Sequence, residues 1–124
     1  MMKILCAVTH PDVRKALANL IVSTGPEVES VECEADVLEC LDANSAYDAV
    51  LLYLFTGRSG TDLLNLIRAN KRLVALPIIV VCEPVFKEFV LRQNATFANE
   101  EFLTDSVTAA LADIAKSMPQ PIAT

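Results

Sequence analysis

The sequence predicts a three-layer α/β fold, in which helices cover both faces of a doubly wound, parallel sheet of five strands in the order 2-1-3-4-5. Three continuous apolar runs, at residues 4–8, 49–55 and 78–82, are typical of strands covered on both faces. Segments with helical periodicity follow these runs, so strands and helices alternate along the chain. Because parallel strand–helix–strand units have right-handed crossovers, this (βα)5 alternation favours one sheet between two helical layers.

Two weaker segments complete the predicted sheet at its edges. Residues 28–33 alternate imperfectly between apolar and polar side chains and are rich in Glu. Residues 95–98 form a short segment, and edge strands are often short. We therefore predict that these segments are the second and the fifth strand.

The first predicted helix follows the first strand. Thr9 or His10 can cap it, with Pro11 in its first turn, and the Gly and Pro at residues 25–26 end it. Its apolar side chains recur at helical spacing, which predicts an inward stripe of Val13, Ala16, Leu17, Leu20 and Ile21.

The next two helices follow the second and third strands. The second is predicted at residues 35–43. Thr61 is the predicted cap of the third helix. Its inward residues are predicted to be Leu63, Leu64 and Ile67.

The last two helices complete a single domain. The fourth is predicted from Pro84 to about Gln93, and Thr104 is the predicted cap of the fifth. The inward stripe of the fifth helix is predicted to be Val107, Ala110, Leu111 and Ile114. Two prolines beyond residue 117 end regular structure, so we expect a domain at residues 1–117 and a flexible C-terminal tail at 118–124.

Composition excludes several classes of protein. The chain is 53% hydrophobic and 21% charged, which excludes intrinsic disorder, and its net charge of −6 disfavours binding to nucleic acid. No apolar run is long enough for a signal peptide or a membrane helix, so we expect no membrane association. The four Cys show no CxxC spacing and there is one His, so we expect no metal and no cofactor, and a reducing, cytoplasmic location.

Four segments together resemble the receiver domain of bacterial two-component response regulators. They are ILCAVTHPDV at residues 4–13, YDAVLLYL at 47–54, GTDLLNLIR at 60–68 and LPIIVV at 76–81. The resemblance covers about residues 3–117 and implies the flavodoxin-like fold, as well as a place in phosphorelay signal transduction. In the family, an aspartate that ends the third strand accepts a phosphoryl group beside a Mg²⁺ site.

At the positions that carry this chemistry, the sequence departs from the family. The acidic pair that holds the metal falls on Val8 and Thr9, and the phosphoacceptor falls on Tyr53. The hydroxyl residue falls on Cys82 and the Lys falls on Glu100. We therefore predict a degenerate pseudo-receiver without catalytic residues, which is not an enzyme. Asp48 does not rescue the site, because it is predicted at the opposite end of its strand.

The fourth helix is the predicted contact surface. Five of the seven residues at 85–91 are apolar, more than a single inward stripe needs, which favours a protein partner or self-association. This surface is predicted to include the fifth strand and fifth helix, with Phe86, Phe89, Val90 and Phe97 as its candidate residues. The function predicted first is therefore a phosphorylation-independent protein–protein interaction module.

Two alternatives remain open at this point. A small-molecule or redox sensor would use Tyr53, Thr9, His10 and Cys82 at the carboxyl edge of the sheet, although each also suits a purely structural role. Residues 27–42 carry seven acids and no Lys or Arg, which is consistent with a docking patch for a basic partner or with a solvated edge that resists aggregation.

Overall fold

The computed structural model describes residues 3–8, 10–23, 25, 27–32, 34–43, 47–53, 57–73, 76–99 and 103–117. The strands are β1 (Lys3–Ala7), β2 (Glu27–Val31), β3 (Ala49–Tyr53), β4 (Ile78–Cys82) and β5 (Thr96–Asn99). The α-helices are α1 (Pro11–Ser23), α2 (Glu34–Ala43), α3 (Gly57–Ala69), α4 (Lys87–Arg92) and α5 (Leu103–Ser117). Two short 3₁₀ helices are η1 (Lys71–Leu73) and η2 (Pro84–Phe86).

The five strands form one parallel sheet in the order β2-β1-β3-β4-β5, which confirms the predicted fold class. The central strands are aligned so that Leu5 pairs with Val50, and Leu52 with Val80. β1, β3 and β4 are buried on both faces, as their continuous apolar sequences require.

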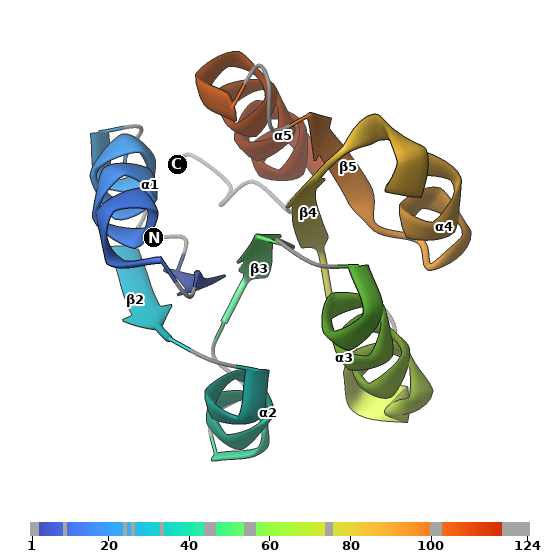
Figure 1. Ribbon diagram of the computed structural model, residues 1–124. Coiled ribbons are helices and arrows are strands. Elements are labelled where there is room, and N and C mark those ends of the chain that lie inside the picture. Colours follow the sequence, from blue (N-terminus) through green and yellow to red (C-terminus); the bar gives the residue numbers. More distant parts are fainter. Residues whose placement is uncertain are drawn as a thin grey trace, which may run out of the picture.

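Helices cover the two faces of the sheet in separate layers (Figure 1). α1 and α5 pack on one face, with a core that includes Ile4, Leu17 and Val107. α2, α3 and α4 pack on the other, with a core that includes Leu5, Val37 and Leu64. Because neighbouring residues of a strand point to opposite faces, each central strand contributes to both cores.

The structure departs from the sequence-based expectations at two helix starts and at one residue within α1. α3 begins at Gly57, four positions before the predicted cap Thr61, and α5 begins at Leu103, so Thr104 lies within its first turn. Ala16 is exposed rather than inward-facing. Glycine has low helix propensity, so the Gly and Ser residues of the first turn of α3 concealed the true start.

The predicted fourth helix is divided into η2 and α4. Glu83 is extended (φ −68°, ψ 150°), as expected for a residue before proline. Asn94 ends α4 with a left-handed φ of 56°, and its N–H donates to the Leu91 carbonyl at 3.0 Å. The Ala95 N–H donates to the Val90 carbonyl at 3.2 Å, which completes a Schellman motif.

Candidate functional site

The carboxyl edge of the sheet holds three of the five residues that the sequence singled out. β1, β3 and β4 are adjacent in the sheet, so Val8, Tyr53 and Cys82 reach the same edge. Val8 is 1% exposed and Cys82 is fully buried, whereas Tyr53 is half-buried. Thr9 and Glu100 lie outside the described residues.

These three side chains do not converge on one point. Val8 and Tyr53 pack on the face that α1 and α5 cover. Cys82 packs on the opposite face, under α2, α3 and α4. Among the predicted site residues that the structure describes, Val8 and Tyr53 therefore share one face of the sheet, and Cys82 lies on the other.

The side chains of Val8 and Tyr53 are poorly suited to bind a cation or to accept a transferred group. Val8 has no ligand atom, and a tyrosine hydroxyl is mostly protonated at neutral pH. Within the described ranges, no cluster of three or more His, Cys, Asp or Glu side chains is placed to hold a metal ion. The predicted absence of a metal stays a prediction, because Thr9 and Glu100 lie outside those ranges.

Asp48 has a structural partner at the other end of the sheet. Its Oδ2 accepts a hydrogen bond from the Lys3 backbone N–H at 2.8 Å. The Asp48 N–H in turn donates to the Lys3 carbonyl at 2.8 Å. This reciprocal pair holds the start of β1 beside the start of β3, at the amino edge.

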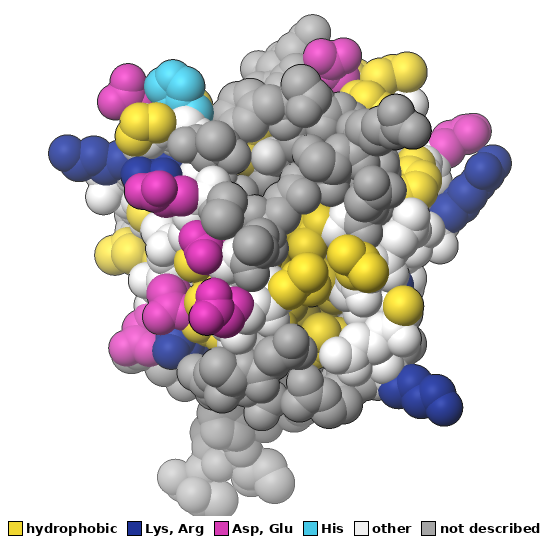
Figure 2. All heavy atoms as spheres, turned by 60° about the horizontal axis from the view of Figure 1, so that its bottom comes forward, with side chains coloured by type: hydrophobic (Ala, Val, Ile, Leu, Met, Phe, Trp, Pro, Cys, Tyr) yellow, Lys and Arg dark blue, Asp and Glu magenta, His cyan; other side chains and the backbone are white. Residues whose placement is uncertain are grey.

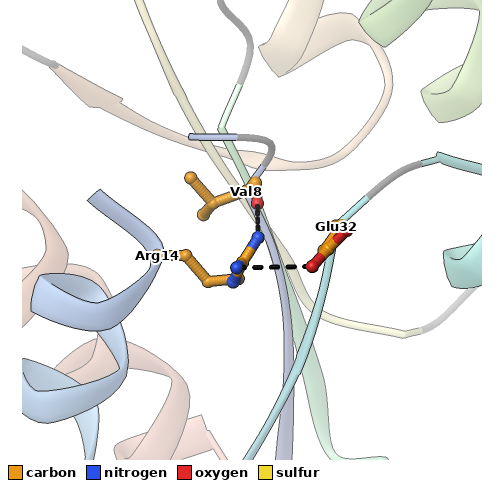
Figure 3. Close-up of polar contacts among 3 residues, drawn as sticks. All are labelled: Val8, Arg14 and Glu32. Atoms are coloured by element: carbon orange, nitrogen blue, oxygen red, sulfur yellow. Dashed lines mark hydrogen bonds and ion pairs between the residues drawn. The ribbon is translucent and has the colours of Figure 1, made fainter. Parts of the chain in front are cut away.

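Arg14 is a residue of the edge that the sequence analysis missed. Its Nη1 donates to the Val8 carbonyl at 3.3 Å, and its Nη2 lies 3.5 Å from Oε1 of Glu32 (Figure 3). The side chain of Arg14 is 22% exposed, so its positive charge is held beside the end of β1. One signal was available, because a cation in the first turn of a helix opposes the helix dipole and needs a compensating partner.

The described cysteines are poorly placed for redox chemistry. Cys6 and Cys82 are not in a disulfide, and they lie fully buried on opposite faces of the sheet, so they cannot be joined without rearrangement of the sheet. Burial raises the pKa of Cys6 to about 12, opposed by the charge of Arg14. Burial also raises the pKa of Cys40, with a further contribution from Glu29. Thiols that stay protonated are weak nucleophiles.

The predicted contact surface on the fourth helix is partly exposed. Val85 is 76% exposed and Leu91 is 52% exposed, while Phe86 and Phe89 are half-buried against the core. Val90 was wrongly assigned to this surface, because it is fully buried. α4 has six residues, and Val90 is the one that points directly at the sheet and packs in the core with Ala95.

Phe97 lies on β5 next to this surface. Its ring is half-buried against the core beneath α4. The Lys87 Nζ of α4 lies 5.7 Å from the centre of the Phe97 ring, within range of a cation–π contact. Lys87 therefore links α4 to the aromatic residue of β5.

Arg68 of α3 fixes the end of α4, and the sequence analysis missed this residue too. Its Nε donates to the Gln93 carbonyl at 2.8 Å, and its Nη2 to the Asn94 carbonyl at 2.9 Å. Its Nη1 donates to the Leu73 carbonyl at 2.8 Å. Arg68 also lines a hollow of about 260 Å³ at the amino edge, away from Tyr53.

Comparison with solved structures finds the same fold in several response regulators. The chemotaxis protein CheY4 of Vibrio cholerae is 17% identical, with a TM-score of 0.78 over 92% of this chain and 98% of that one. A putative response regulator from Chloroflexus aurantiacus is 18% identical, with a TM-score of 0.81 over 93% and 98%. The response regulator TrrA of Thermotoga maritima, solved in complex with Mg²⁺–BeF, is 21% identical, with a TM-score of 0.79 over 92% and 99%.

These likenesses establish that the chain has the fold of response-regulator receiver domains. No protein-family model matches the sequence, and no curated protein matches it significantly. Among the described residues, no helix is long and apolar enough to cross a membrane.

Proposed function

We propose that the chain is a receiver-like signalling domain that does not accept a phosphoryl group and acts as a protein–protein interaction module. The observation that carries this proposal is the composition of the carboxyl edge, where Tyr53 ends β3 and buried Val8 follows β1. The receiver family, which the sequence resembles, has carboxylates at both positions.

The surroundings of the edge support the same proposal. A phenol is a poorer phosphoacceptor than a carboxylate, because its pKa of about 10 leaves it protonated at neutral pH. The Arg14 guanidinium, held 3.3 Å from the Val8 carbonyl, adds a fixed positive charge that would repel Mg²⁺. TrrA, which shares the fold, was solved with Mg²⁺–BeF, and within the described part of this chain no group of three or more His, Cys, Asp or Glu side chains is placed to hold a metal ion.

The chain is expected to remain unmodified when incubated with acetyl phosphate and Mg²⁺. Intact-mass spectrometry is the measurement, with a phosphorylatable receiver domain as the positive control. Tyr53→Asp is also expected to stay unmodified, because Val8 still cannot hold the metal. A stoichiometric gain of about 80 Da, the mass of one phosphoryl group, that brief alkaline treatment removes would contradict the proposal.

The surface around η2 and α4 is the proposed contact site. Val85 and Leu91 place branched apolar side chains in solvent on a short segment whose own core residue is Val90. Phe86 and Phe89 lie half-buried beside them, and the cation–π contact of Lys87 continues the surface onto β5. Partly exposed aromatic residues beside exposed aliphatic ones are typical of the centre of an interface.

Val85→Ala and Val90→Ala form a matched pair that tests this surface. Val90→Ala is expected to lower the free energy of unfolding by about 2 kcal/mol, because it opens a cavity in the core. Val85→Ala is expected to change it by less than about 0.5 kcal/mol, because the side chain is exposed. Self-association or partner binding should instead weaken in Val85→Ala, as judged by sedimentation and urea unfolding. Unchanged association in both Val85→Ala and Leu91→Ala would show that the contact surface lies elsewhere.

A further inference from the structure

The hollow that Arg68 lines, of about 260 Å³, opens at the amino edge of the sheet, at the opposite end of the strands from Tyr53. Its lining includes Ile78 and Thr96, the first residues of β4 and β5, so it lies where these two strands begin. Residues near the ends of α3 and α5 complete the lining. Sites for drug-sized ligands occupy roughly 300–1,000 Å³, so this hollow suits a smaller molecule.

Two of the described residues that line the hollow are charged, and their charges have opposite signs. Arg68 belongs to α3, which packs on one face of the sheet, and Asp113 belongs to α5, which packs on the other (Figure 1). The first residues of β4 and β5 lie between these two helices. A molecule that lies across this part of the amino edge therefore has a positive charge on one side and a negative charge on the other.

Arg68 provides a fixed positive charge. Its hydrogen bonds to the carbonyls of Leu73, Gln93 and Asn94 hold the guanidinium group in place. Burial lowers the pKa of Arg68, which means that its charge is partly removed from water, although an arginine stays protonated at neutral pH. Because charges attract more strongly where water is partly excluded, the α3 side of the hollow favours a carboxylate. The hydroxyl of Thr96, which also lines the hollow, can donate a hydrogen bond to the same group.

Asp113 provides the negative charge on the α5 side of the hollow. Its side chain is exposed, near the end of α5. Figure 2 shows a separate group of acidic side chains over α2 and β2, and β2 and β5 are the two opposite edges of the sheet. The hollow is therefore distinct from that acidic surface, and Asp113 is the carboxylate that an ammonium group in the hollow would meet.

Much of the remaining lining is apolar. Ile78 and Ile114 are buried, while Leu76 and Pro77 are half-buried just before β4. Such side chains favour contact with an aliphatic chain over contact with water. A simple anion would be repelled by Asp113 and a simple cation by Arg68, whereas a molecule with one charge of each sign satisfies both sides.

We propose that this hollow binds a small aliphatic zwitterion, with a carboxylate at one end and an ammonium group at the other, as in an ω-amino acid. The carboxylate faces Arg68 and Thr96, the ammonium group faces Asp113, and the aliphatic chain covers Ile78. Arg68 also holds the Asn94 carbonyl, so the bound molecule strengthens the end of α4. This inference does not rest on the function proposed above.

Titration of the ¹⁵N-labelled chain with ε-aminocaproate tests the proposal. The amide shifts of Ile78, Thr96 and the end of α5 are expected to change, with a dissociation constant in the millimolar range, as is usual for so small a ligand. Caproate and hexylamine, which each lack one of the two charges, should bind about fivefold more weakly. Hydrogen exchange at the amides of Asn94 and Ala95 should become slower when ε-aminocaproate is bound, because these amides close the end of α4.

Asp113→Asn tests the contact with the ammonium group. It should weaken the binding of ε-aminocaproate by about fivefold and leave caproate, which has no ammonium group, no weaker than before. Asp105→Asn is the matched control, because Asp105 is also exposed on α5 but lies in its first turn, away from the hollow. It should leave the binding of both ligands unchanged.

The proposal is overturned if ε-aminocaproate at tens of millimolar causes no shift changes, or if the changes map to the carboxyl edge. Equal binding of the three ligands, equal effects of Asp113→Asn and Asp105→Asn, or unchanged hydrogen exchange at Asn94 in the saturated chain would also overturn it. None of these measurements involves phosphoryl transfer or association through α4, so their failure would leave the function proposed above untouched.

Discussion

Raising the pH from 9 to 12 is expected to lower the free energy of unfolding by about 3 kcal/mol through the buried thiol of Cys6 alone. Burial raises the pKa of this thiol from its ordinary value of 9.0 to about 12, while the nearby charge of Arg14 acts in the opposite direction. In the folded chain the thiol therefore stays protonated over a range in which the unfolded chain loses the proton.

The sign of this effect follows from proton binding. Below pH 9 the thiol is protonated in both states and its contribution to stability is fully present. Above pH 9 the unfolded state binds fewer protons, so stability falls by about 1.4 kcal/mol per pH unit until the folded thiol also ionises.

Urea unfolding at a series of alkaline pH values measures this loss. Cys6→Ala is the control, because it removes the thiol while Lys and Tyr side chains continue to titrate. The pH dependence of the wild-type chain should exceed that of Cys6→Ala by the amount given above. Parallel curves for the two proteins would mean that the folded thiol ionises as readily as the unfolded one.

Replacement of Arg68 by Ala is expected to lower the free energy of unfolding by about 3 kcal/mol. The side chain donates to the carbonyls of Leu73, Gln93 and Asn94, and hydrogen bonds from a charged donor contribute about 1.5–3 kcal/mol each. The total stays below three times that amount, because the site is partly exposed and water can reach the carbonyls after substitution. Arg68→Lys should recover little, because an ammonium group lacks the planar fork that reaches three acceptors.

Arg92→Ala is the matched control for this substitution. Arg92 pairs with Glu88 at 3.8 Å, with side chains 79% and 88% exposed, so its loss should cost less than about 0.5 kcal/mol. Hydrogen exchange gives a local readout, because the amides of Asn94 and Ala95 close the end of α4 that Arg68 holds. Faster exchange at these amides is expected in Arg68→Ala alone. Equal stability losses in the two variants would contradict the role assigned to Arg68.

The sheet and much of the core were predictable from the sequence, because burial on both faces leaves a direct pattern. The run at residues 78–82 became β4 without a change of bounds, and each of its residues is buried. The four inward residues predicted for the last helix are all buried: Val107, Ala110, Leu111 and Ile114. A pattern of period 3.6 also identified Leu63, Leu64 and Ile67.

The local details that failed depend on tertiary contacts. In the sequence, Val90 is one of five apolar residues between positions 85 and 91, and nothing distinguishes it from the others. Its burial depends on how the short α4 packs on the sheet. Arg14 and Arg68 act on backbone carbonyls, including that of Asn94, 26 residues away from Arg68. Every residue has a carbonyl, so the sequence cannot mark which ones a guanidinium will reach before the fold is known.

The strand order also governs how the sheet can be assembled during synthesis. β1 pairs with both β2 and β3, so a three-stranded sheet can form as soon as the chain up to Tyr53 has left the ribosome. β4 and then β5 add to one growing edge in the order of translation. Asp48 helps to close the first of these units, because it joins the start of β3 to Lys3 across 45 residues. We therefore expect the segment around α4 to become ordered late, after the sheet that supports it has formed.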